Sequence, residues 1–232
     1  MRGKYSTKIV FLCLFCLIPS VCLAQESICY GTSEKGRLEN GVKLPSSGKN
    51  FTSYGAIPEL AGRTYVHTVA REIVIDAYEA LYKEHPTKVY KFAETGLEEG
   101  GKFKPHKTHE NGSSVDFIVP VLDSKGRSVY LPTTAFNKYG YGIEFDAKGQ
   151  YKDYRIDYEA LAAHIVALDK AAKKHKITLR RVIFDPRLAP NLYNTQYGEY
   201  LKKNIIIPQK NSWVRHDEHY HVDFNLNCKP LS

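Results

Sequence analysis

Long apolar runs are scarce in this sequence, and none reaches the roughly 20 residues that a membrane-spanning helix needs. One run, at residues 9 to 18, follows the basic residues Arg2, Lys4 and Lys8. The stretch after it closes on Ala24 and has small residues at the two positions that signal peptidase inspects. The sequence therefore predicts a cleavable signal peptide at residues 1–24, a mature chain at 25–232 without a membrane span, and a periplasmic or secreted location.

Cysteine is also scarce, because three of the five cysteines leave with the predicted signal. Lipidation at Cys22 is an alternative, but Val21 stands where a small residue is expected. The remaining pair, Cys29 and Cys228, forms no Cys-x-x-Cys motif, which argues against a redox enzyme or a thiolate zinc site. In an oxidising compartment such a pair predicts a disulfide, and two free thiols are the alternative.

Internal repeats, low-complexity linkers and dense basic clusters are absent as well. The whole chain has a formal net charge of +8, and its basic residues are spread out. The nearest basic cluster, residues 170–181, fits the solvated end of a helix and the start of a strand better than a nucleic-acid surface, which needs clustered charge. The sequence predicts one domain, long enough for a real core, and no nucleic-acid partner.

What the sequence does contain is a histidine-rich stretch at residues 213–224, which is typical of a β-strand in its second half. Alternate side chains of a strand point to opposite faces. His219 and His221 therefore share one face, and the apolar side chains of Tyr220, Val222 and Phe224 share the other. Two imidazoles on one face can serve as two metal ligands, or as a ligand beside a catalytic base.

A second polar cluster precedes this strand by about a hundred residues. His109 and Asp116 flank a turn rich in Asn, Gly and Ser, and Asp116 begins a nearly continuous apolar run. A carboxylate buried in such a run is costly unless it is paired or binds a metal. Zinc binds His nitrogen and Asp oxygen, and a catalytic zinc site keeps three protein ligands. His109, Asp116 and His221 make such a set and predict one Zn²⁺ per chain.

The spacing His-x6-Asp, followed far downstream by His-x-His, resembles that of the lysostaphin/D-Ala-D-Ala metallopeptidase group, zinc peptidases that cut bacterial cell-wall peptides. Within this group the chain is most similar to the penicillin-insensitive murein endopeptidase branch. A further histidine, His106, lies three residues before the first ligand, and another, His216, lies three residues before the His-x-His. The resemblance is strong over the two motifs and weak over the rest of the mature chain.

This resemblance implies that the three residues named above are the zinc ligands. It makes His219 the catalytic base or the stabiliser of the transition state, with His216 in support. His106 and Trp213 are expected to contact the substrate or a ligand, and a solvated loop position is the alternative for His106.

The periodicity of apolar residues predicts the rest of the fold. Helices are expected at residues 65–84, 158–176 and 192–203, and strands at 88–93, 115–122, 177–185 and 219–224. Asp157 is expected to cap the second helix. Residues 25–62 are expected to form an irregular wrap, and the Tyr-rich residues 123–155 a hairpin-like excursion that grips a peptide or a sugar, or simply packs. The result is an α+β domain with helices on one face of a mostly antiparallel sheet and a zinc cleft on the other, like the hedgehog and DD-peptidase domains of that group.

The activity that these features predict is hydrolysis of peptide cross-links in bacterial peptidoglycan by a zinc-dependent endopeptidase. A D,D- or L,D-carboxypeptidase or dipeptidase of the same group is a second interpretation. A binding module that docks on the cell wall without catalysis is a third, although a pure binder has no chemical need for His219. The sequence determines neither the bond that is cleaved nor the oligomeric state.

Overall fold

One five-stranded sheet organises the fold, in the order β12-β13-β7-β6-β4. The computed structural model describes residues 25–210 and 214–231, so the predicted signal peptide and Trp213 lie outside the described residues. The strands are β4 (Phe51–Ser53), β6 (Tyr90–Phe92), β7 (Ser114–Ile118), β12 (Leu179–Ile183) and β13 (His219–Phe224). Neighbours are antiparallel except β4 and β6, which are parallel. The prediction of a mostly antiparallel sheet is therefore confirmed.

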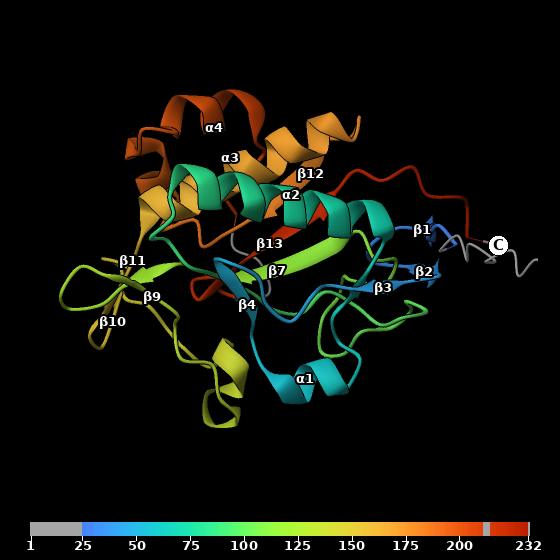
Figure 1. Cartoon of the computed structure of the whole chain (residues 1–232), viewed down its shortest axis with the longest axis horizontal. Coiled ribbons are helices and arrows are strands. Elements are labelled where there is room, and N and C mark those ends of the chain that lie inside the picture. Colours follow the sequence, from blue (N-terminus) through green and yellow to red (C-terminus); the bar gives the residue numbers. More distant parts are fainter. Residues whose placement is uncertain (1–24, 211–213, 232) are drawn as a thin grey trace, which may run out of the picture.

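Two long helices, α2 (Thr68–Glu84) and α3 (Tyr158–Lys174), pack against each other over one face of this sheet (Figure 1). Both helices bury apolar residues spaced three and four apart, such as Ile73, Ala77 and Leu81 on α2. Beneath them the sheet presents buried apolar residues, including Phe117 and Tyr220, whose rings stack at 5.4 Å. Each fully buried side chain of this size stabilises the fold by about 1.5–3 kcal/mol.

Polar side chains fix where these two helices begin. The Asp157 carboxylate accepts a hydrogen bond from the Ala160 amide at 3.1 Å, which confirms the predicted cap of α3. It also pairs with the Lys88 ammonium at 2.5 Å. At the start of α2, the Nδ1 atom of His67 accepts from the Val69 amide at 3.1 Å.

The predicted helix at residues 192–203 is present as two shorter pieces. A 3₁₀ segment, η2 (Ala189–Asn194), comes first, and α4 (Gly198–Asn204) follows it. Both contact α3, so they extend the helical layer on the same side of the sheet.

The expectation of an irregular wrap at residues 25–62 is wrong. This segment forms the hairpin of β1 (Ile28–Gly31) and β2 (Gly36–Glu39), then β3 (Val42–Lys43), which pairs with β5 (Tyr65–Val66), then β4 and the short α1 (Ala56–Leu60). The Gly, Ser, Pro and Asn residues of the segment form turns between short strands instead of a coil. Helix α1 lies on the side of the sheet opposite α2 and α3 (Figure 1).

The excursion at residues 123–155 contains two hairpins around a 3₁₀ segment. With β8 just before it, the excursion forms a second sheet in the order β10-β11-β8-β9. Its elements are β8 (Val121–Leu122), β9 (Ser128–Val129), η1 (Ala135–Gly140), β10 (Gln150–Tyr151) and β11 (Tyr154–Ile156). Segment η1 projects from the body on the same side as α1 (Figure 1).

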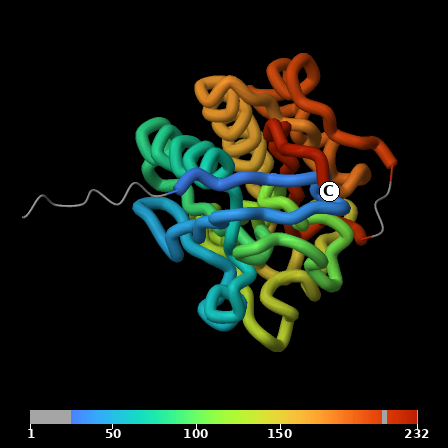
Figure 2. Tube along the Cα trace, turned by 90° about the vertical axis from the view of Figure 1, so that its right-hand side faces the viewer, coloured from blue at the N-terminus to red at the C-terminus, as the bar shows by residue number. Residues whose placement is uncertain are grey.

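The two ends of the described chain lie side by side. The predicted disulfide joins Cys29 to Cys228 across 199 residues of sequence. Two backbone hydrogen bonds reinforce this junction, from Gly31 to Lys229 at 2.8 Å and from Lys229 to Cys29 at 2.9 Å. Figure 2 shows the C-terminal segment beside the hairpin of β1 and β2. Across the described residues, no helix is both long and apolar enough to cross a membrane.

Candidate metal centre

The site is built around Asp116, a fully buried carboxylate on β7. Asp116 is the cross-strand partner of His221 on β13, so both side chains lie on the sheet face opposite α2 and α3. The Nδ1 atom of His221 lies 2.9 Å from Asp116 Oδ1, and Nε2 of His219 lies 3.7 Å from Asp116 Oδ2. Both histidines of the His-x-His therefore face the same carboxylate.

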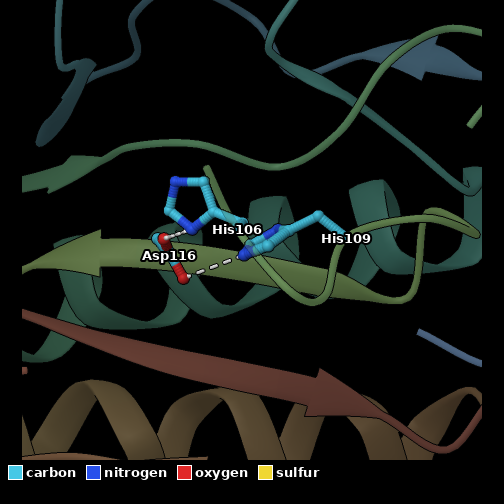
Figure 3. A group of neighbouring side chains, drawn as sticks. All are labelled: His106, His109 and Asp116. Atoms are coloured by element: carbon cyan, nitrogen blue, oxygen red, sulfur yellow. Dashed lines mark ion pairs between the residues drawn. The ribbon is translucent and has the colours of Figure 1, made fainter. Parts of the chain in front are cut away.

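The loop before β7 brings two more histidines to this carboxylate. We call residues 105–113 the ligand loop. Nε2 of His109 lies 3.3 Å from Asp116 Oδ1, and Nδ1 of His106 lies 3.8 Å from Asp116 Oδ2 (Figure 3). One nitrogen of each histidine and one oxygen of Asp116 lie within 4.8 Å of one another, so these three residues can hold a metal ion.

His109 gives the clearest sign that a cation fits here. Its Nδ1 atom lies 3.0 Å from the Thr95 carbonyl, to which it must donate its proton, so Nε2 carries a lone pair. Burial lowers the pKa of His109, which favours this neutral form. Nε2 is buried without a hydrogen-bond partner among the described residues and faces a carboxylate. A lone pair and a carboxylate oxygen repel each other unless a cation lies between them.

The carboxylate itself is ionised. Burial alone would raise the pKa of Asp116, but the charge of His219 and the hydrogen bond with His221 hold it well below its usual range. The phenol of Tyr141 donates a hydrogen bond to Asp116 Oδ2 at 2.8 Å. Burial and the charge of Asp116 raise the pKa of Tyr141, so it remains a proton donor.

His221 lies between two carboxylates. Its Nε2 atom lies 2.8 Å from Asp223 Oδ1, on the side away from Asp116. Burial would lower the pKa of His221, but Asp223 and Asp116 together raise it to about 10. Asp223 is tied in turn to Ser114 at 2.5 Å and Arg181 at 2.6 Å. This chain of contacts fixes the His221 ring, and a metal that takes Nδ1 displaces a proton.

His106 is held by Glu94, a residue that the sequence did not single out. Nε2 of His106 lies 2.5 Å from Glu94 Oε2, which leaves Nδ1 facing Asp116. Glu94 also forms a two-pronged ion pair with Arg63, at 2.6 and 2.8 Å. Although burial opposes its charge, His106 and Arg63 lower the pKa of Glu94 to about 2. The sequence predicted His109, Asp116 and His221 as ligands, whereas the group that can hold an ion in the structure is His106, His109 and Asp116.

Glu218 holds the ring of His219 in one orientation. Its Nδ1 atom lies 2.7 Å from Glu218, so Nε2 is the nitrogen that faces the site. Burial would lower the pKa of His219, but Glu218 and Asp116 raise it above its usual value. The ring of His216 lies against that of His219, with centroids 4.6 Å apart. Burial and His219 lower the pKa of His216 to about 4, so it is neutral at neutral pH.

The ligand loop is held in a strained shape. His109 adopts a left-handed backbone with φ of 73°, which costs a residue with a Cβ about 1–2 kcal/mol. Gly112 also has positive φ, and a Cβ there would lie 2.7 Å from the His67 amide nitrogen. Asn111 closes the turn, because its Oδ1 accepts from the Ser113 hydroxyl at 2.6 Å, and its Nδ2 lies 3.4 Å from the Cys228 sulfur. The loop is thereby fastened to the disulfide.

A pocket of about 460 Å³ opens beside the histidines. Its wall includes His106, Tyr141 and His219, together with apolar side chains such as Ile143 and Val214. The site is therefore accessible to a ligand of peptide size, on the sheet face that the helices leave free. Trp213, expected at this site from the sequence, lies outside the described residues.

Neither a comparison of the chain with protein-family models nor one with curated proteins finds a match.

Proposed function

We propose that the chain is a zinc-dependent peptidase that hydrolyses peptide cross-links of bacterial peptidoglycan. The observation that carries the proposal is the unpartnered, buried Nε2 of His109, which faces an ionised Asp116 in a ring of histidines beside an open pocket. Zinc is the metal that best suits His and carboxylate ligands of this kind, and bound zinc polarises a carbonyl and activates water at neutral pH. The cell-wall substrate is supported by the motif spacing and the predicted export signal.

In this proposal, each side chain around Asp116 has a separate role. His219 accepts at Nε2 the proton that the attacking water loses and returns it to the leaving amine, while Glu218 fixes its other nitrogen. Tyr141 stays protonated and holds Asp116 in place. His216, neutral and packed on His219, keeps that ring oriented. Asp223 keeps the His221 ring oriented through its contact with Nε2, on the side away from Asp116.

The test compares purified mature protein with variants at two of these histidines. His109→Ala is expected to lose both zinc and activity, because it removes a ligand. His219→Ala is expected to keep zinc and to lose about 10²–10⁴-fold in turnover, because it removes only the base. His175→Ala is a matched control. His175 follows the last residue of α3 and contacts Glu72 and Asp76 on α2, away from the histidines around Asp116.

Mass analysis of cross-linked muropeptides after digestion names the bond, and metal analysis counts the zinc. Release of a terminal residue without cleavage of cross-links would identify a carboxypeptidase or dipeptidase instead. Binding of wall fragments without any cleavage, with or without chelator, would indicate that the protein is a binding module. Stoichiometric zinc and full activity in His109→Ala would show that the metal lies elsewhere.

A further inference from the structure

The charged side chains on the wall of the pocket are paired unevenly. Glu94 pairs with Arg63 and His106, as described above. Glu218 pairs with Nδ1 of His219 at 2.7 Å. These carboxylates face the pocket with their charge already compensated.

The other two acidic residues on the wall share one arginine. Arg215 contacts Glu144 at 2.7 Å and Asp217 at 2.6 Å, and its Nη2 atom also donates to the Phe145 carbonyl at 2.7 Å. These three hydrogen bonds leave Nε and one hydrogen of Nη1 without a contact, but the charge of the guanidinium is shared between two carboxylates. Arg215 shapes the wall of the pocket and does not supply a free positive charge.

Lys138 is the cation that remains. Its side chain lines the pocket and is exposed, and no hydrogen bond or ion pair joins its ammonium to any residue in the described ranges 25–210 and 214–231. An ammonium is a strong donor with a full charge, and a pocket lined in part by apolar side chains weakens the water screening that would compensate it. Among the described residues that line the pocket, Lys138 is thus a cation without a carboxylate partner, and its ammonium can pair with a negative group of a ligand.

The backbone that carries Lys138 is fixed in an unusual shape. Lys138 and Tyr139 both adopt left-handed conformations, with φ of 51° and 56°. The turn is closed by a hydrogen bond from Tyr139 to the Thr134 carbonyl at 2.7 Å, and by the Asn137 side chain, which accepts from Gly140 at 3.0 Å. The Tyr139 ring also packs edge-on against Tyr54, at 6.2 Å between centroids. Lys138 is thus presented to the pocket from a defined position.

We infer that Lys138 binds a carboxylate of the substrate beside the scissile bond and makes the site selective for anionic peptides. This inference rests on the proposed peptidase function and names the substrate class of the same site. The carboxylate is either the free end of a peptide or an acidic side chain next to the cleaved bond. Both offer the same chemistry to an ammonium group.

The experiment uses three synthetic peptides with one scissile bond. The first carries an acidic side chain next to the bond, the second carries a free terminal carboxylate at the same distance, and the third has both groups amidated. The readout is the ratio of kcat/KM for each carboxylate peptide to kcat/KM for the amidated one. Comparing the first two peptides identifies the source of the carboxylate.

Wild-type protein is expected to prefer one carboxylate peptide by about tenfold, the usual size of a charge-assisted hydrogen bond. Lys138→Met is expected to bring this ratio close to one, Lys138→Arg to keep it, and Lys138→Glu to reverse it. Lys148→Met is the matched control, because Lys148 is an exposed lysine of the same excursion whose side chain is not on the pocket wall. An unchanged ratio in Lys138→Met would overturn the inference, as would a wild type that does not discriminate.

Zinc content and calorimetric binding separate this inference from the proposed function. If zinc-loaded wild type cleaves none of the peptides, the proposed function fails. Binding of the intact carboxylate peptides then tests Lys138 directly, and weaker binding to Lys138→Met than to wild type supports its role. Equal binding to the two proteins overturns it.

Discussion

Removing the disulfide should cost the protein a large part of its stability. The Cys29–Cys228 bridge closes a loop of 199 residues. In the chain-entropy model a loop of that length stabilises the folded state by about 5 kcal/mol relative to the open chain. A domain of this size is typically stable by only about 5–15 kcal/mol in total. The variant Cys29→Ala/Cys228→Ala is preferable to serine, because Cys29 is almost fully buried and a hydroxyl there would lack a partner.

The structure also indicates what this variant should leave intact. The chain ends remain joined by the hydrogen bonds between Lys229 and its two partners on β1. In the ligand loop, Asn111 loses its contact with the Cys228 sulfur but keeps its hydrogen bond to Ser113. We therefore expect zinc affinity to fall less than tenfold, while the free energy of unfolding falls by about 4–5 kcal/mol.

Urea denaturation of both proteins in the presence of chelator measures the disulfide without the contribution of bound metal. Wild type under reducing conditions should unfold at the same urea concentration as the double-alanine variant. Mass analysis without reductant confirms that the wild-type thiols are oxidised together. A loss of less than about 1 kcal/mol in both the variant and the reduced protein would refute the argument from loop closure.

Three further outcomes follow from buried polar groups. Burial lowers the pKa of His164 to about 3. Between about pH 3 and pH 6.5 the unfolded chain therefore binds one more proton than the folded chain. The contribution of neutral His164 to the free energy of unfolding is complete above about pH 6.5 and falls by up to about 1.4 kcal/mol for each pH unit below it. In urea titrations from pH 7 to pH 4, His164→Phe should therefore lose less stability with falling pH than wild type, and parallel curves would contradict this. Asp157→Ala should lower the free energy of unfolding by about 2 kcal/mol, because α3 loses its cap. Lys88→Met removes only the ion pair with Asp157, so the same measurement on this variant gives the part of the loss that is due to the ion pair. Glu94→Gln should weaken zinc binding about 10–100-fold in competition with a chelating dye, and an unchanged affinity would place His106 outside the ligand set.

Local patterns in the sequence predicted the long elements well. The apolar stripes gave α2 and α3 within a few residues of their ends, and the alternation in the last strand gave the common face of His219 and His221. The cap at Asp157 and the pairing of Cys29 with Cys228 were also predictable, because each depends on residue type and compartment. These features arise from periodicity or from chemistry that leaves few alternatives.

The parts that the sequence did not reveal depend on contacts between distant segments. Glu94 follows the short buried strand β6, and only the folded sheet brings it to His106. Tyr141 is one of many tyrosines in its excursion, and nothing local distinguishes the one that binds Asp116. The strands of residues 25–62 are two to four residues long, too short to show a period of two.

The position of β13 has a consequence for how the molecule is made. This strand is the last of the described strands, yet it lies inside the sheet, between β12 and β7. Until it emerges during synthesis, β7 and β12 lack their shared partner, and Asp116 has no His221 opposite it. The sheet and the candidate metal centre can therefore form only after residue 224 has been synthesised, which gives slow folding dominated by contacts distant in sequence. A chain that ends before residue 219 should expose two unpaired strand edges and aggregate, instead of folding as a shorter domain.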